Sequence, residues 1–262
     1  IERPMTIAIT TTLDYEFPQP SDVLLQLEAA IIPEQTVEKA HIAISPTEHF
    51  ARIVGHGGLG DRIWLRVPGR LTGGYNATVS INRFCTEVDS LPAVDTCLLP
   101  GETVDYLLPS RYCASDRFQN FVHAQFGHLS GGARVAAIRD WIMARFTYTM
   151  GVSHAGTTAL DTFVLRQGVC RDFAHVLITL VRAGGIPARF ASVYALGVEP
   201  QDFHAVAEVF LDGAWHLIDA TGMAQAADMA KIGIGRDAAD VSFLTSYGMA
   251  LLNAQSVTVS AL

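Results

Sequence analysis

Hydrophobic and polar residues alternate with a period of two along the first third of the chain. Segments with this pattern are rich in Thr, Ile and Val, and turn-forming residues such as Pro33 and Pro68-Gly69 separate them. Several short strands at this spacing are typical of a β-sandwich. The pattern therefore predicts a sandwich-like N-terminal β domain, with strands at residues 6–15, 35–44, 50–54, 61–67 and 74–84.

Residues 85–114 lose this periodicity. They contain Pro92, Pro100 and Pro109 together with many leucines. Since a free tether would not need so many leucines, we expect an ordered linker that lies on the next domain. We place the domain boundary within it, with residues 1–105 forming the β domain with its linker and residues 106–262 forming a second domain.

Helical spacing of apolar residues follows Ser115-Asp116, a typical start of a helix. A second helix is predicted over residues 131–146, and a third from Cys170 to Gly184-Gly185, with Pro187 just beyond. Strand patterns then resume at residues 188–196, 203–211, 214–218 and 256–262.

The composition excludes several classes of protein. Half of the residues are hydrophobic and 17% are charged, so extensive disorder is not expected. The net charge is −8 and no basic run occurs, which argues against a nucleic-acid partner. No apolar run approaches the roughly 18 to 20 residues of a membrane-spanning helix, and the first residues do not resemble a signal peptide. We expect no membrane association; the sequence predicts no particular oligomeric state.

Four cysteines occur at irregular positions, 85, 97, 113 and 170. No C-x-x-C pair is present, so a structural zinc site is not expected. Cys85 and Cys97 could pair in an oxidising compartment, but we expect reduced thiols and a cytoplasmic location. No acidic cluster resembles a calcium loop and no glycine motif resembles a phosphate-binding loop. We therefore expect no cofactor.

Cys170 follows Gly168-Val169 and stands at the predicted start of a helix. Free backbone N–H groups and the positive end of the helix dipole favour a thiolate there, and Arg171 adds positive charge. The same N–H groups could hold an oxyanion. A lone cysteine is more often a small buried hydrophobic residue, so this stretch alone favours the structural interpretation.

A nucleophilic thiol needs a base. His175 lies five residues after Cys170, about 140° round the helix, and does not face it. His204 begins a predicted hairpin whose two strands flank Asp212-Gly213, a strong signal for a two-residue turn.

With that turn, paired residue numbers sum to 425, so Leu211 pairs with Ala214. His204 and Asp219 then share one face of the hairpin as diagonal neighbours, whereas His216 faces the other way. A loop longer by one residue would reverse this result. Cys170, His204 and Asp219 thus form a possible nucleophile, base and orienter; the alternative is an ordinary cross-strand contact.

These residues also resemble a known family. The motif GVCRDFAH at 168–175, followed by GIPAR at 185–189, His204-Ala205 and Asp219-Ala220-Thr221, is similar to the transglutaminase-like superfamily. It resembles most closely the bacterial branch often named as cysteine proteases, and the match extends over about residues 105–245. The resemblance implies an α+β fold, in which the β-sandwich-like domain precedes a papain-like, transglutaminase-like core of helices packed on an antiparallel sheet. It implies catalytic roles for Cys170, His204 and Asp219.

Three positions depart from the family pattern. Val206 replaces a common Trp, Ala220 a common Pro, and Arg171 the Trp that follows the cysteine in animal-type transglutaminases. None of them removes a member of the triad. Arg171 argues against assuming protein crosslinking.

The expected function is attack on a peptide or amide carbonyl through a thioester acyl-enzyme, most simply as a peptidase or amidase acting on a peptide or protein substrate. Transfer of the acyl group to an amine is one alternative. A non-enzymatic interaction module is another, and a metal site using Cys170, His204 and Asp219 is a third. A second oxyanion donor is not identified by the sequence; Gln167 and Tyr148 are the candidates. Asp172, Arg236 and Asp237 are expected to have structural roles.

Overall fold

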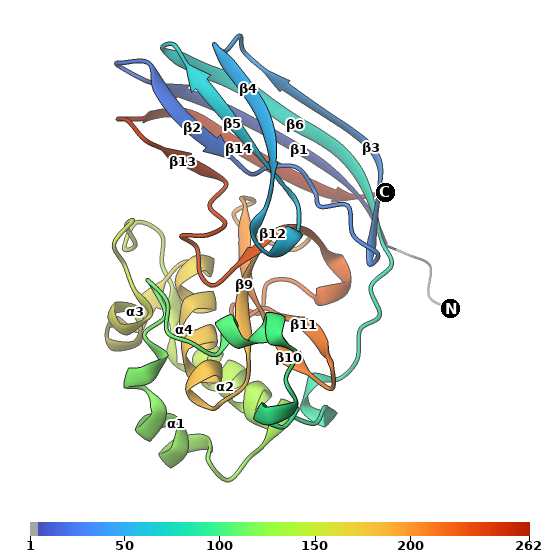
Figure 1. Cartoon of the computed structure of the whole chain (residues 1–262), viewed down its shortest axis with the longest axis vertical. Coiled ribbons are helices and arrows are strands. Elements are labelled where there is room, and N and C mark those ends of the chain that lie inside the picture. Colours follow the sequence, from blue (N-terminus) through green and yellow to red (C-terminus); the bar gives the residue numbers. More distant parts are fainter. Residues whose placement is uncertain (1–4) are drawn as a thin grey trace.

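The computed structural model describes residues 5–262, which fold into a β-sandwich and a mixed helix and sheet body below it (Figure 1). The first sheet of the sandwich has the strand order β14-β1-β6-β3 and is antiparallel. Its strands are β1 (Met5–Glu16), β3 (Gln35–Ile44), β6 (Arg70–Ile81) and β14 (Leu251–Ala261).

The second sheet of the sandwich has the order β13-β2-β5-β4 and is also antiparallel. Alternate residues of β1 and β5 are buried, as the period of two predicts, and they meet in one apolar core. β2 was not predicted from the sequence, because it is short and bordered by prolines. The strands of this sheet are β2 (Ser21–Leu25), β4 (His49–Val54), β5 (Asp61–Val67) and β13 (Leu244–Ser246).

The end of the chain returns to the sandwich. β14 pairs along nearly the whole of β1, and β13 pairs with β2. Both strands come from the range 106–262 that the sequence assigned to the second domain. The alternation within a strand shows that it pairs, but it does not identify the partner. The division at residue 105 therefore remains a prediction about folding units, and the sandwich itself uses residues from both sides of it.

Residues 82–118 connect the two parts in an ordered path with four short 3₁₀ turns, at Val88–Ser90, Thr96–Leu98, Gly101–Tyr106 and Ser115–Arg117. Val88 and Leu91 pack on the core of the helical part. Gly132 approaches this path so closely that a Cβ would lie 1.6 Å from the Val88 carbonyl oxygen, and its N–H donates to Leu91. The linker thus lies on the following part, as its leucines predicted.

The second part packs helices on an antiparallel sheet of order β11-β10-β9-β12. The apolar residues of α4 pack against β9 and β10, and α4 is buried along most of its length. The predicted α+β fold class is therefore confirmed. The sheet contains β9 (Ala188–Ala195), β10 (His204–Leu211), β11 (Ala214–Ile218) and β12 (Met229–Gly235), and the helices are α1 (Gln119–Phe126), α2 (Gly131–Arg145), α3 (Ala159–Leu165) and α4 (Cys170–Ala183).

Shared packing joins the two parts. Tyr194 of β9 and Ile232 of β12 are fully buried in the core of the sandwich. The Tyr194 hydroxyl donates to the Leu27 carbonyl oxygen over 2.7 Å. Beside them the buried Glu208 carboxylate accepts from Arg189 over 2.7 Å and from Lys231 over 2.5 Å. The sheet of the second part is therefore anchored in the sandwich.

Candidate active site

The start of α4 presents Cys170 at its first residue. The Asp172 carboxylate accepts the Val169 N–H over 3.0 Å and so closes the first turn back on the chain before it. Gly168 permits this approach, because a Cβ there would lie 2.7 Å from Cβ of Asp172. Cys170 is half-buried, and the N–H groups of the first turn lie beside its thiol.

The hairpin that carries His204 has the predicted register. Leu211 pairs with Ala214 and Ala207 pairs with Ile218. Asp212 and Gly213 both have positive φ, 50° and 77°, as the two-residue turn requires. The ladder ends before Asp219, but the side-chain alternation carries through, because His204 and Asp219 meet.

Nε2 of His204 lies 2.9 Å from Oδ2 of Asp219, and both side chains are buried. The carboxylate is fixed from its other side: Oδ1 accepts from the N–H and the hydroxyl of Thr221, and Oδ2 accepts the Ala224 N–H. Thr221 and Ala224 were not predicted as ligands of this carboxylate. Their hydrogen bonds arise from the loop after β11, which has no periodicity to predict it.

Burial and charge compete at both groups. Burial alone would lower the pKa of His204, but hydrogen bonds to Asp219 and Cys170 outweigh it and raise the pKa to about 9. Burial would raise the pKa of Asp219, yet the hydrogen bond and charge of His204 and the bonds from Thr221 lower it. The pair is therefore an imidazolium and a carboxylate at neutral pH.

The Cys170 thiol completes the group. Because Nε2 of His204 is bound to Asp219, Nδ1 is the ring nitrogen left for Cys170; within residues 5–262 it has no hydrogen-bond partner, and His204 and Cys170 line the same pocket. Sγ of Cys170 also lies 3.9 Å from the Phe203 carbonyl oxygen. The structure thus brings together all three residues that the sequence selected.

Tyr148 also lies close to Cys170. It lies in β7 (Thr147–Tyr148), which pairs with β8 (Gln167–Gly168) directly before α4. Burial, the charge of Cys170 and hydrogen bonding with it set the pKa of Tyr148, which is raised to about 12. The phenol is therefore a neutral hydrogen-bond donor beside the thiol. The Gln167 side chain is exposed.

The other histidines on α4 and on the β10–β11 hairpin, His175 and His216, make structural contacts instead. His175 is fully buried, its ring stacks on Tyr112, and its Nε2 accepts the Ala238 N–H. Burial, helped by Arg171 and Arg182, holds the pKa of His175 well below its usual value. His216 is bonded to the Leu211 carbonyl oxygen on the opposite face of the hairpin.

Charged residues near α4 hold the surrounding loops. Arg171 donates to the Ser153 hydroxyl and the His154 carbonyl oxygen, each over 2.7 Å, and to Asp172 over 3.1 Å. The Asp237 carboxylate accepts the Tyr112 N–H, and Arg236 pairs with Asp240.

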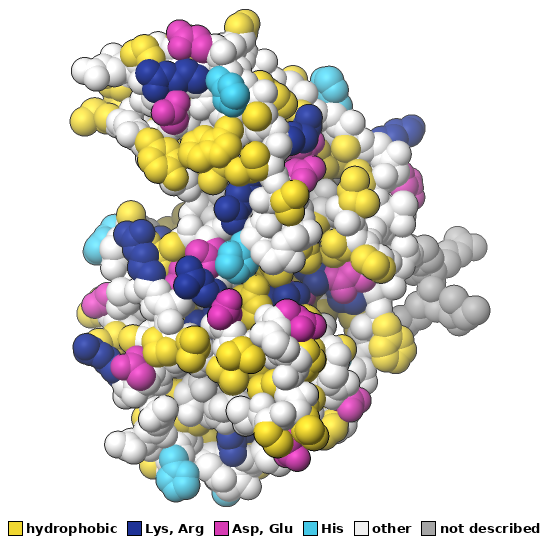
Figure 2. Space-filling model, viewed as in Figure 1, with side chains coloured by type: hydrophobic (Ala, Val, Ile, Leu, Met, Phe, Trp, Pro, Cys, Tyr) yellow, Lys and Arg dark blue, Asp and Glu magenta, His cyan; other side chains and the backbone are white. Residues whose placement is uncertain are grey.

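A pocket of about 230 Å³ opens beside the thiol. Figure 2 shows the surface hollowed between the sandwich and the helical part, on the side where Figure 1 places β13 and α4. The sequence did not predict the pocket, whose walls come from four separate segments. It is lined by Cys170, Arg171, Phe190, Ser192, Asp202, Phe203, His204, Ala205, Ala238, Val241, Ser242, Phe243 and Leu244.

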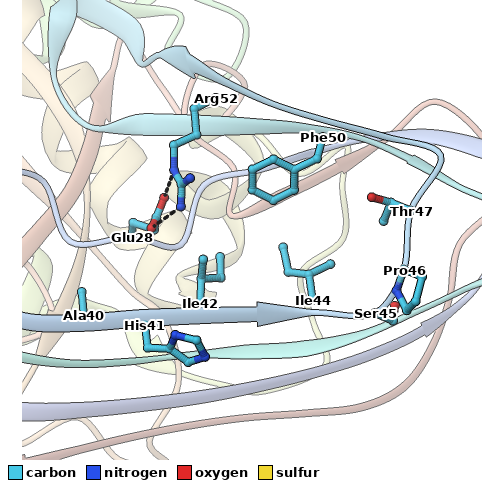
Figure 3. Close-up of a pocket in the computed structure, with 10 residues that line it drawn as sticks. All are labelled: Glu28, Ala40, His41, Ile42, Ile44, Ser45, Pro46, Thr47, Phe50 and Arg52. Carbon is cyan, nitrogen blue, oxygen red and sulfur yellow. Dashed lines mark hydrogen bonds and ion pairs between the residues drawn. The ribbon is translucent and has the colours of Figure 1, made fainter.

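A second hollow, of about 550 Å³, lies in the sandwich between β3 and β4. Figure 3 shows Ile42 and Ile44 pointing across it toward Phe50, with the Arg52–Glu28 ion pair at one end. None of the three candidate catalytic residues lines it.

Two further observations concern the described chain. Within residues 5–262, no group of three or more His, Cys, Asp or Glu side chains is arranged to hold a metal ion. Over the same residues, none of the helices has both the length and the apolar character needed to cross a bilayer.

Comparisons with known proteins agree with this architecture. The family model of the transglutaminase-like superfamily core matches residues 119–220, which include Cys170, His204 and Asp219. A crystal structure described as a “Putative Cysteine Protease from Cytophaga hutchinsonii” superposes with a TM-score of 0.92 and 31% identity, covering 100% of this chain and 92% of that one.

Curated relatives match a shorter region. An uncharacterized protein of Mycobacterium leprae is 31% identical over 119 residues, which is 42% of each chain, and one of Mycobacterium tuberculosis is 36% identical over 69 residues, or 25% of this chain and 22% of its own. The matched region thus spans less than half of these relatives. The Cytophaga hutchinsonii structure, in contrast, matches this chain over its whole length. Together with the match to the family model, this similarity shows that the chain belongs to the transglutaminase-like superfamily.

Proposed function

We propose that the protein is a cysteine-dependent hydrolase that cleaves peptide or amide bonds through a thioester acyl-enzyme. The observation that carries the proposal is the hydrogen bond of His204 to Asp219, with the unbonded Nδ1 of the same ring and the Cys170 thiol at the start of α4 lining one pocket. A nucleophile, a base and an orienting carboxylate in hydrogen-bond reach are the requirements for this chemistry.

The first half of the reaction forms the acyl-enzyme. The proton that Cys170 and His204 share rests on Nδ1 of the His204 imidazolium, and Sγ of Cys170 attacks the carbonyl carbon, whose π electrons move to oxygen. When the carbonyl reforms, the C–N bond breaks and the leaving amine takes the proton from His204. Asp219 holds the ring by its Nε2–H and stabilises the imidazolium.

The second half releases the acid. His204 takes a proton from water, the resulting hydroxyl attacks the thioester, and the C–S bond breaks to give a carboxylic acid and the free thiol. The oxyanion formed in both halves would be held by the Cys170 N–H at the start of α4. The neutral phenol of Tyr148 is the second donor that we propose, because it lies beside the same thiol.

Water is the acceptor that we favour over an amine. Arg171 occupies the position where animal-type transglutaminases have Trp, and its guanidinium is bonded to the loop before α3. A non-enzymatic interaction module is less well supported, because Cys170 is half-buried and lines a pocket rather than being sealed in the core. The substrate class is peptide or protein, and a cytoplasmic location is part of the proposal.

Site-selective alkylation tests the activated thiol. Iodoacetamide at pH 6 should label Cys170 faster than Cys85 or Cys97, both of which are more exposed. Peptide mapping by mass spectrometry assigns the label, and the Cys170→Ala variant should lose the fast phase while Cys97→Ala keeps it. A fast phase that survives Cys170→Ala would overturn the proposal.

Hydrolysis and transfer are then separated by product analysis. A panel of fluorogenic peptide amides is incubated with and without a primary amine such as cadaverine. We expect the free acid as the main product in both mixtures. Predominant amide formation with the added amine would instead identify acyl transfer.

A further inference from the structure

One wall of the pocket beside Cys170 comes from the segment between β12 and β13. Residues 238–244 run from β12 to β13 and contribute Val241, Phe243 and Leu244 to the lining. Phe243 packs on Phe203, the residue before His204. The catalytic sheet therefore forms only part of the pocket.

This wall is fixed by the sandwich. The Phe243 ring stacks on Phe203 with centroids 4.5 Å apart and planes 10° apart, and Phe203 packs in turn on Tyr194. The Phe243 carbonyl oxygen accepts the Gln26 N–H from the end of β2, and Arg62 of β5 donates to the Asp240 carbonyl oxygen. Such a wall keeps its shape when the pocket is empty.

The pocket has room for one side chain. Its volume of about 230 Å³ is below the roughly 300 to 1,000 Å³ of sites that take a whole ligand. An apolar cavity of about 150 Å³ is enough for benzene. A ring or a branched aliphatic group therefore fits.

The lining favours an apolar guest. The two charged residues at the rim are already engaged: Arg171 with Ser153, His154 and Asp172, and the Asp202 carboxylate with the Phe203 N–H and Gln255. The Ser242 hydroxyl is bonded to the Ala238 carbonyl oxygen. Apart from Cys170, His204 and the Ser192 hydroxyl, what remains facing the pocket is aromatic and aliphatic, from Phe190, Ala205, Ala238, Val241, Phe203, Phe243 and Leu244.

We propose that this pocket binds an aromatic or large aliphatic side chain flanking the attacked carbonyl, and that Phe243 determines the preference. The inference rests on the proposed function, because the pocket can select a substrate only if Cys170 attacks one. It assigns the β-sandwich a part in substrate selection, because the sandwich holds the wall in place.

The first test compares peptidyl chloromethyl ketones that carry Gly, Leu, Phe, Asp or Lys at the two positions before the ketone. Alkylation of Cys170 should be about 10- to 100-fold faster with Phe or Leu than with Gly, as expected for burying one such side chain. Equal rates for Gly and Phe, or a preference for Asp or Lys, would contradict the inference.

Variants locate the preference. Phe243→Ala should reduce the Phe-to-Gly rate ratio about tenfold, and Phe243→Leu should give an intermediate ratio if the alanine variant folds poorly. Tyr247→Ala is the matched control, because Tyr247 is an aromatic residue that directly follows β13 and packs on Trp64 outside this pocket. The ratio cancels changes in thiol reactivity, so an equal loss in Phe243→Leu and Tyr247→Ala would argue against a specificity role.

A binding measurement separates this inference from the proposed function. In the Cys170→Ala protein, N-acetyl-phenylalaninamide should shift NMR signals of residues 238–244 at lower concentration than N-acetyl-glycinamide does. If N-acetyl-phenylalaninamide binds selectively but the natural protein shows no fast iodoacetamide reaction, the inference about the pocket stands and the proposed hydrolase function is contradicted. A fast iodoacetamide reaction of the natural protein, without selective binding, would do the reverse.

Discussion

At the scale of single residues, Asp219 is the most constrained member of the site. Four donors reach its two oxygens: the ring of His204, the N–H and hydroxyl of Thr221, and the Ala224 N–H. Charge-assisted bonds of this kind are the strong ones. The carboxylate therefore fixes both the orientation of the imidazole and the tautomer that presents Nδ1 to Cys170.

Replacement of this carboxylate tests its role. Asp219→Asn keeps the size but loses the charge, so the imidazole tautomer is no longer enforced, and we expect kcat to fall by roughly two to four orders of magnitude. The pKa of His204, read from the pH profile of Cys170 alkylation, should also fall. Asp140→Asn, on the exposed face of α2, is the control. An unchanged profile in Asp219→Asn would show that the two side chains do not act together.

The raised pKa of His204 also predicts a pH dependence of stability. A histidine whose pKa rises from 6.5 unfolded to about 9 folded stabilises the protein fully below pH 6.5. That contribution, of up to about 3 kcal/mol, is lost as the pH rises from 6.5 through about 9. Melting temperatures of the natural protein should fall over this range more steeply than those of His204→Gln. Parallel curves for the two proteins would contradict the ion pair.

At the scale of elements, the start of α4 and the turn of the β10–β11 hairpin position the residues of the candidate site. Both follow from local sequence: Gly168 permits the close approach of Asp172, and Asp212-Gly213 adopts the two positive φ angles of its turn. α3 and β12 were not predicted. α3 is only seven residues long, although Thr158 and Asp161 cap it reciprocally, and Gly233 and Gly235 obscure the strand pattern of β12.

A single methyl group tests the start of α4. In Gly168→Ala the new Cβ would lie 2.7 Å from Cβ of Asp172, so the first turn of α4 must move. The hydrogen bond from the Val169 N–H to the Asp172 carboxylate must then lengthen. We expect a loss of about 1 to 3 kcal/mol in stability and slower alkylation of Cys170. Gly101→Ala is a suitable control, because nothing lies within 4 Å of its Cβ. Equal behaviour of the two variants would show that the approach at Gly168 is dispensable.

At the scale of the whole molecule, the sandwich and the part that combines helices with the β11-β10-β9-β12 sheet share a core. Tyr194, Ala230 and Ile232 belong to the β11-β10-β9-β12 sheet but are buried in the core of the sandwich. The chain also closes the sandwich with its last strand, β14, beside its first, β1 (Figure 1). The two parts are therefore expected to lose their structure together.

Deletion of residues 251–262 tests this coupling. Without β14, one edge of β1 is unpaired, and the apolar contacts of Val257 and Val259 with the sandwich core are lost. We expect the melting temperature and the alkylation rate of Cys170 to fall together, with one calorimetric transition in the natural protein. Leu252→Ser, at an exposed position, should change neither. A truncated protein with a destabilised sandwich but a natural rate at Cys170 would argue for independent units.

The sequence by itself determined the strands with clear alternation, the main helices, and the register that places His204 and Asp219 on one face. These features depend on neighbouring residues, because periodicity and turn geometry act over a few positions. Only the tertiary structure decided that β13 and β14 pair with strands of the N-terminal sandwich. It also decided that Tyr148 lies close to Cys170 and that Phe203 and Phe243 meet in one pocket wall. Those contacts join segments far apart in the chain, and their formation depends on packing, which no local pattern records.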